Sequence, residues 1–580
     1  MRRAAAPILL VALSLAGLAA SAAGSSTSRP GATAAIPGNV IIRARPGRVA
    51  EAEKLVVRLG GSIRLPLRLI GGFSATLPSR AVAKLRHSGL VASVTANRAL
   101  RPQSSSYTAD YDPSTDGYSM SQITQLTGAR DWWKAGYTGK GVDIALIDSG
   151  VAPVQGLSSP DQLVNGADLS VESQAGNLRY LDTYGHGTFM AGLIAGRDSA
   201  PSPSAPAATY LGMAPDARIV SLKVASADGG TDVTQVIAAI DWVVQHRDDN
   251  GLNIRVINLS YGTNSLQGYQ DDPLAFAAEQ AWKHGIVVVA AGGNDGFQKK
   301  KNVPALADPA IDPFLIALGS ADTNATAGLG DDKVPSFSPW PKKAGPRSVD
   351  LLAPGAHVQG LRVPNSYIDA NYPKGALSER YFRGSGTSES TAIATGAVAL
   401  ILQKYPDATP DQVKKLLLSA AAPIKGKSQA IGAGELQLGP VLNASLPQWT
   451  QTWTPSTGTG SLEASRGSDH LTRNNVVLSG EQDIFGQPVD TTALAASEAS
   501  GNSWSGGMWN GSTWSGNSWS GNSWSTVGWT GNSWSGNSWS TGAWSGNSWS
   551  GNSWSSTNWS GNSWSGNSWS GGSWAGDSWG

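Results

Sequence analysis

Short aliphatic runs alternate with helical patterns over residues 120–446, and this alternation limits the fold more than any other feature of the sequence. Helical patterns cover residues 231–246 and 272–284, and the runs are GVDIALID, RIVSLKVA, IRVINLSYG, GIVVVAAGG, PFLIALGS and SVDLLAPG. Nearly continuous Val, Ile and Leu strands separated by helices are typical of a parallel sheet covered on both faces. We therefore predict an α/β fold with a parallel sheet, in which functional groups gather at the carboxyl ends of the strands.

Three separate segments supply the residue types needed for acyl transfer. Asp148 ends the first aliphatic run in ALIDSGV, His186 lies in YGHGTFMAG, and Ser388 lies in GSGTSESTA. Serine is a poor nucleophile at neutral pH unless a base removes its proton, and an acid must hold the tautomer of that base. An isolated Asp after a strand is more often a turn residue, but the three segments together predict an Asp148, His186 and Ser388 triad.

Two hydrogen-bond donors for an oxyanion are predicted beside Ser388. A good helical pattern, ESTAIATGAVALILQKY, follows this serine, so its backbone N–H is expected at a helix N-terminus, free to donate. Asn294 in VVVAAGGNDG comes after another aliphatic run and is the expected second donor. Gly-Asn-Asp-Gly alone would indicate a turn, but its place after a buried strand favours a functional role.

The chain order Asp, His, Ser is that of subtilisin and differs from the orders in chymotrypsin and the α/β-hydrolases. On these motifs, residues 120–446 resemble the subtilisin-like serine proteases, or subtilases. The resemblance implies a serine endopeptidase that hydrolyses peptide bonds through an acyl-enzyme. It also implies that extended substrates bind along Ser260, Tyr261 and Gly262 and face a second pocket wall formed by Ala291, Gly292 and Gly293. The double glycine is expected to widen the pocket for large apolar side chains.

The residues that follow the nucleophile depart from the pattern of this family. Relatives usually carry Met, Ala, Ser or Thr, then Pro, whereas this chain has Glu389, Ser390, Thr391 and Ala392. Alanine is a strong helix former, so the helix is expected to begin normally without proline. Glu389 is expected to place a negative charge near the oxyanion site, where the helix dipole stabilises a carboxylate.

The N-terminal sequence predicts export and self-inhibition. Two arginines, an apolar run too short to span a bilayer and small residues near Ala22 are typical of a signal peptide, here residues 1–23. Residues 37–102 have a strand, helix, strand, helix, strand pattern and resemble the inhibitory propeptide of subtilases; a permanently attached N-terminal domain is the alternative. Residues 103–119 are a predicted processing linker. We therefore expect a secreted enzyme matured by removal of a propeptide that also inhibits it.

Composition limits the stabilising groups and partners. The chain has 580 residues, no cysteine and a formal net charge of +1. Disulfides are therefore excluded and a large apolar core must stabilise the fold, while the charge gives no reason to expect nucleic acid as a partner. The predicted chemistry requires no cofactor. Relatives often bind structural calcium, but no loop here is specific enough to assign metal ligands.

The C-terminal sequence has two parts. Residues 447–500 are polar and are predicted to form a linker or small adapter. Over residues 501–580, Trp recurs at every fifth position from Trp504 to Trp579, mostly between Gly, Asn and Ser. A disordered tail and an ordered β-solenoid both fit this spacing. Because exposed Trp rings stack on sugars and other rings, we predict that the tail binds cell-wall glycan or self-associates. Binding to cell-wall glycan would attach the secreted protein to the cell surface.

An inactive subtilase scaffold that presents the Trp repeats as a surface-binding module is the alternative function. The altered sequence after Ser388 and the length of the tail support it. Against it, the three triad residues and Asn294 are all present. A sedolisin would carry glutamate in place of His186, and an esterase would need GxSxG around its serine. We therefore expect an active peptidase.

Overall fold

The computed structural model describes residues 39–67, 70–96, 111–174, 178–298, 304–342, 347–473, 476–505 and 507–513. The chain divides into two compact units, residues 1–105 and 106–580, and each is described by itself. The predicted signal peptide and residues 103–110 of the predicted processing linker lie outside the described residues. None of the described helices is long and apolar enough to cross a membrane.

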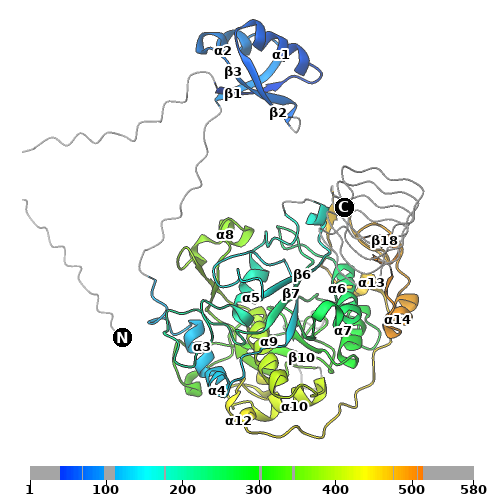
Figure 1. Cartoon of the computed structure of the whole chain (residues 1–580). Helices are drawn as coiled ribbons and strands as arrows, with labels where there is room; N and C mark the ends of the chain where they lie inside the picture. The colour runs from blue at the N-terminus through cyan, green and yellow to red at the C-terminus, as the bar shows by residue number, and fades with distance from the viewer. Residues whose placement is uncertain are drawn as a thin grey trace, which may run out of the picture. The chain divides into compact units, whose positions relative to one another are not determined.

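The N-terminal unit is a small antiparallel sheet with two helices. Its strands are β1 (Asn39–Ala44), β2 (Ser62–Leu67), β3 (Gly72–Thr76) and β4 (Val91–Ala96), in the order β2-β3-β1-β4. Helices α1 (Val49–Arg58) and α2 (Ser79–Arg86) cover one face of this sheet (Figure 1). The core between the helices and the sheet contains the fully buried Ile42, Val56, Phe73 and Leu85. The predicted strand and helix order is present, with β2 as one further strand.

Strand β2 was not predicted because its sequence, SIRLPL, lacks the usual signals. It lies at the edge of the sheet, and most of its residues are exposed. An edge strand tolerates Pro66 because a proline cannot donate to a neighbouring strand and does not need to do so there. The apolar alternation that marks a half-buried strand is consequently weak.

A seven-stranded parallel sheet forms the centre of the second unit, in the order β11-β10-β9-β8-β5-β7-β6. Six strands correspond to the six predicted aliphatic runs: β5 (Asp143–Asp148), β7 (Arg218–Lys223), β8 (Ile254–Leu259), β9 (Val287–Ala291), β10 (Ile316–Ala321) and β11 (Leu351–Pro354). The seventh, β6 (Leu163–Asp168), is an edge strand with partly exposed residues. The predicted parallel sheet is therefore confirmed, extended by one strand.

Helices cover both faces of this sheet (Figure 1). Helices α5 (His186–Ala195) and α9 (Thr387–Lys404) pack on each other, and α6 (Val233–His246) and α7 (Pro273–Lys283) form a second pair. The two predicted helical patterns become α6 and α7. Asp232 begins α6 with a capping box, and the Asp272 carboxylate caps α7 by accepting from the backbone N–H groups of Leu274 and Ala275.

Shorter elements complete the unit. The helices are α3 (Met120–Leu126), α4 (Ala129–Lys134), α8 (Tyr367–Asn371), α10 (Pro410–Ala420), α11 (Ser428–Ile431), α12 (Gly439–Leu442), α13 (Leu462–Arg466) and α14 (Thr491–Ala499). The strands are β12 (Val358–Leu361), β13 (Tyr381–Gly384), β14 (Thr472–Arg473), β15 (Val476–Val477), β16 (Trp504–Ser505), β17 (Met508–Trp509) and β18 (Ser512–Thr513).

The C-terminal segment up to Thr513 packs on helix α6 of the second unit. The indole of Trp504 donates to the carbonyl of Ala238 at 2.7 Å, and that of Trp509 donates to the carboxylate of Asp241 at 2.7 Å. Trp509 is fully buried. Residues 447–500, predicted as a linker or adapter, and the first two Trp of the five-residue period thus lie in the same compact unit as the sheet. The remaining Trp repeats lie outside the described residues.

Candidate active site

Asp148 lies at the carboxyl end of β5, next to the centre of the sheet. Its carboxylate accepts hydrogen bonds from Ser149 N at 2.7 Å and from Nδ1 of His186 at 2.8 and 3.0 Å. A buried carboxylate is unfavourable without such donors, and only 6% of this side chain is exposed. The sequence therefore places an acid where a parallel sheet presents its functional groups, and the fold supplies its imidazole partner.

His186 is the first residue of α5. Gly185 before it has φ of 104°, a left-handed conformation that favours glycine. Gly187 after it lies against the chain at Gly150, where a Cβ would overlap the Gly150 carbonyl oxygen. The glycines flanking this histidine thus bring the start of α5 directly onto the turn that follows Asp148.

A buried carboxylate that was not predicted fixes the start of α5. Asp182 Oδ1 accepts from Gly185 N at 2.6 Å and from the Ser149 hydroxyl at 2.8 Å. Its Oδ2 accepts from the backbone N–H and the hydroxyl of Thr188 at 2.8 and 2.6 Å. These bonds satisfy N–H groups that a helix N-terminus leaves free, and they join the Asp148 turn to the His186 helix. The signal in the sequence was an aspartate four positions before the histidine.

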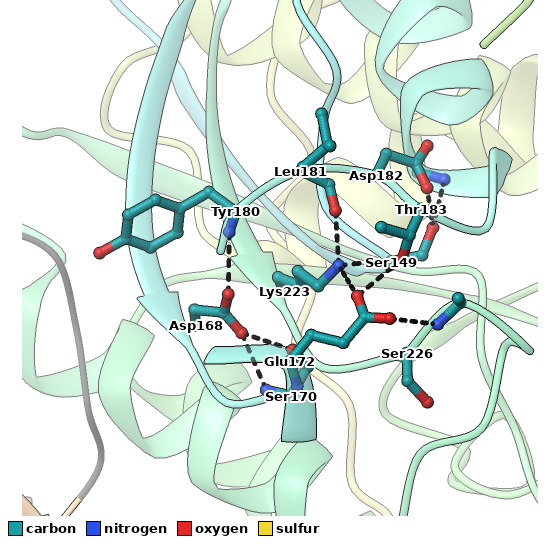
Figure 2. Close-up of polar contacts among 12 residues, drawn as sticks. Ser149, Asp168, Ser170, Glu172, Tyr180, Leu181, Asp182, Thr183, Lys223 and Ser226 are labelled. Carbon is teal, nitrogen blue, oxygen red and sulfur yellow. Dashed lines mark hydrogen bonds and ion pairs between the residues drawn. The ribbon is translucent and has the colours of Figure 1, made fainter. Parts of the chain in front are cut away.

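A buried lysine holds the loop that leads to this helix. Figure 2 shows Lys223 Nζ between Glu172, Thr183 and the carbonyl of Leu181. The distances are 2.8 Å to Glu172 Oε2 and 2.5 Å to Leu181 O, and the lysine side chain is fully buried. Lys223 ends β7 and lies opposite Asp148 of β5 in the sheet register. The ammonium group therefore holds the chain at Leu181 and Thr183, shortly before His186.

The electrostatics of the pair favour a protonated imidazole. Burial lowers the pKa of His186, but the charge and hydrogen bond of Asp148, with a smaller contribution from Glu389, outweigh it and raise this pKa to about 9. The imidazole remains 24% exposed, so one edge of the ring is accessible. Such a pair can accept a proton and stabilise the resulting cation.

Ser388 is the second residue of α9. Its hydroxyl donates to Ser260 O at 3.4 Å, and the Ser260 hydroxyl donates to Ser388 O at 3.1 Å. Asn294 lies beside it, with its Oδ1 accepting from Thr387 N at 2.8 Å and from the Thr387 hydroxyl at 3.2 Å. Thr387 holds the amide oxygen of Asn294, so the amide nitrogen of this side chain is the atom that can donate to a ligand.

The predicted binding residues are brought together. One cavity of about 420 Å³ is lined by Ser260, Tyr261, Gly262, Ala291, Gly292, Gly293, Asn294 and Ser388, with Asp469 and other residues. A Cβ at Gly292 would lie 2.7 Å from Leu318 O and 2.9 Å from Pro339, so packing against β10 also requires glycine there. The double glycine thus has a structural reason in addition to the predicted widening of the pocket.

Glu389 follows Ser388 in the sequence and lies near His186 in the structure. It lines a second cavity of about 70 Å³ together with His186 and Phe189. Burial raises the pKa of Glu389 to about 7, although the charge of His186 lowers it. Glu389, next to Ser388, therefore lies beside His186, but burial disfavours its charged form, in contrast to the predicted stabilised negative charge.

No group of three or more metal-binding side chains (His, Cys, Asp or Glu) is arranged around a common point within the described residues. The serine, imidazole, carboxylate and amide described above are suited to acyl transfer, in which a hydroxyl attacks a carbonyl and an imidazole carries the proton.

Comparison with known proteins identifies the family. The Subtilase family model matches residues 139–434. Serine protease AprX of Bacillus subtilis (strain 168) is 37% identical over 322 residues, which are 54% of this chain and 70% of the relative. Subtilisin DY of Bacillus licheniformis is 31% identical over 299 residues, 52% of this chain and 90% of the relative. The crystal structure of a cold adapted subtilisin-like serine proteinase is 27% identical, covering 52% of this chain and 90% of that chain with a TM-score of 0.38. The chain therefore belongs to the subtilase family and is a serine-type endopeptidase.

Proposed function

We propose that this endopeptidase uses Ser388 as nucleophile, His186 as base and Asp148 as the acid that orients the imidazole. The hydrogen bond from His186 Nδ1 to Asp148 carries this proposal, because it leaves Nε2 as the ring nitrogen able to take the proton of Ser388. His186 then returns the proton to the leaving amine, and water hydrolyses the acyl-enzyme. Asn294 Nδ2 and the Ser388 N–H donate to the oxyanion.

Substrates are proteins or peptides bound in an extended conformation along residues 260–262. Main-chain hydrogen bonds to this segment would supply affinity, and the cavity beside it would supply preference for one side chain. None of the proposed steps requires a cofactor; bound calcium stays a prediction without assigned ligands.

The N-terminal unit is proposed to be a propeptide that inhibits the enzyme and is removed by it. Support comes from its independent apolar core and from the Ser-, Asp-, Tyr- and Pro-rich sequence without periodicity that joins it to the peptidase unit. The signal-like residues 1–23 support export, and one relative is named a minor extracellular protease.

Self-maturation is tested by the mass and N-terminus of the exported protein, compared with Ser388→Ala. We expect the native chain to lose about its first hundred residues by the resemblance to subtilase propeptides, and the variant to keep everything after the signal. Ser419→Ala, at an exposed serine on α10, is the control and should mature normally. Identical cleavage of native and variant chains would show that another protease matures it. No cleavage of either would favour the inactive scaffold.

The Trp repeats are proposed to bind cell-wall glycan or to self-associate. Because Trp504 and Trp509 are buried on α6, the deletion that tests this should begin after Thr513 rather than at residue 500. The shortened chain should move from cells or aggregates into the soluble fraction with its peptidase activity unchanged. Unchanged partitioning would contradict both proposed roles of the tail.

A further inference from the structure

The segment that follows α13 contributes a carboxylate to the substrate cavity. We propose that Asp469 determines specificity by favouring a basic residue, Lys or Arg, immediately before the scissile bond; this rests on the proposed function of Ser388. Asp469 lies more than 80 positions after Ser388 in sequence and beyond the matched family region, yet it lines the same cavity as Ser388 and Asn294.

Hydrogen bonds join the segment of Asp469 to one cavity wall. Ser468 N donates to Asn264 Oδ1 at 2.7 Å, and Asn264 Nδ2 donates to the Ser468 hydroxyl at 2.5 Å. The hydroxyl of Thr263 donates to Ser465 O at 2.6 Å. Both Asn264 and Thr263 also line the cavity. The residue before Asp469 is therefore fixed to the wall itself.

A buried arginine, Arg466, also holds the segment that carries Asp469. Arg466 is fully buried, and its Nε lies 2.6 Å from Asp232 Oδ2, while its other nitrogens donate to Gly480 O and Gln482 O at 2.6 and 2.5 Å. The backbone N–H of Asp469 donates to Arg466 O at 3.1 Å, closing a turn. Gly467 within this turn has φ of 62°, and a Cβ there would overlap Asn264. Asp469 thus stands on a rigid turn rather than on a loose tail.

The charged side chains that line the cavity have one sign. Asp469 and Asp295 are the charged residues among its described lining, and the rest of that lining is small, polar or apolar. The neighbouring His470 pairs with Glu463 at 3.0 Å and does not line the cavity. A side chain with an aliphatic stem and a cationic end matches such a cavity, because the stem packs against the walls and the cation is attracted to the carboxylates that line it.

The effect of Asp469 on selectivity for a basic residue is expected to be moderate. Asp469 is exposed, so water and salt weaken its attraction for a substrate cation. We expect a selectivity contribution of about two- to fivefold at low ionic strength, the range found for other exposed charge pairs in close contact. Residues 299–303 include three lysines and lie outside the described residues, so the diagnostic is the change on mutation rather than the absolute preference.

The test compares two peptides that differ only in the residue before the scissile bond, which is lysine in one and its uncharged analogue norleucine in the other. The mature full-length enzyme and Asp469→Asn are assayed for the ratio of kcat/KM between the two. The ratio should fall about two- to fivefold in Asp469→Asn, and the difference should shrink in 0.5 M salt. Asp271→Asn, at an exposed aspartate that does not line the cavity, should leave the ratio unchanged.

An unchanged ratio in Asp469→Asn, with norleucine peptides still cleaved, would overturn this inference alone. Asp469→Lys provides an independent check, because it should raise cleavage after glutamate relative to glutamine. A wild-type chain that cleaves neither peptide and whose Ser388 is not labelled by a fluorophosphonate would overturn the proposed function and this inference together.

Discussion

Replacing Asp148 by asparagine is expected to lower kcat by about 10⁴-fold, as loss of the corresponding charge does in other serine proteases. Ser149 N donates to Asp148 Oδ1, so the amide oxygen would take that position and the NH₂ group would take the position of Oδ2, 3.0 Å from His186 Nδ1. That contact favours the tautomer with the proton on Nε2, which cannot accept a proton from Ser388. The measurement is kcat per active site, with Asp161→Asn, whose side chain is 67% exposed, as the control.

The pH profile separates this loss of orientation from a general loss of structure. With the pKa of His186 at about 9, kcat/KM of the native enzyme should rise with pH until the imidazole is neutral. Removing the Asp148 charge leaves burial as the larger influence, lowers this pKa and moves the acid limb to lower pH. Glu389→Gln should move the limb in the same direction by less, without the 10⁴-fold loss at high pH. A native limb that neither variant moves would contradict the assigned electrostatics.

The buried strands and the segments that carry the site could be predicted because their signals are local. Six aliphatic runs gave six of seven strands, and the helical patterns over residues 231–246 and 272–284 gave α6 and α7. Asp148, His186, Asn294 and Ser388 each follow a strand or begin a helix, so a parallel sheet necessarily gathers them at one edge. The edge strands β2 and β6 were missed because partial exposure removes the apolar pattern.

The remaining site residues depend on contacts between distant parts of the chain. Ser468 bonds to Asn264 across 204 positions, and nothing in GSLEASRGSDHL indicates that Asp469 reaches the cavity. The five-residue Trp period likewise gives no sign that Trp509 packs against a distant part of the chain, because its local sequence resembles that of the later repeats. Only the buried carboxylate of Asp241, 268 positions earlier, gives its indole a hydrogen-bond acceptor. Such pairings arise from tertiary packing, and a single sequence carries no record of them.

Lys223 offers the clearest measure of how such packing supports the site. Lys223→Met removes the ion-pair partner of Glu172, whose side chain is only 12% exposed. It also leaves Leu181 O without its ammonium donor. Breaking a buried ion pair on one side typically costs about 3–5 kcal/mol, because the remaining charge stays buried. We expect the melting temperature of the peptidase unit to fall by roughly 5–10 °C. Melting is measured by calorimetry in a Ser388→Ala background, so that autolysis cannot contribute.

A double variant distinguishes the ion pair from a simple packing effect. Glu172→Gln combined with Lys223→Met removes both charges, so it should recover most of the stability that the single lysine variant loses. In the active background, the single variant should also lower kcat, because residues 181–185 lead directly into His186 and lose their anchor at Leu181. Faster hydrogen exchange at the start of α5 would accompany this loss. A single variant that melts like the parent, with unchanged exchange at α5, would show that Lys223 does not hold the His186 loop.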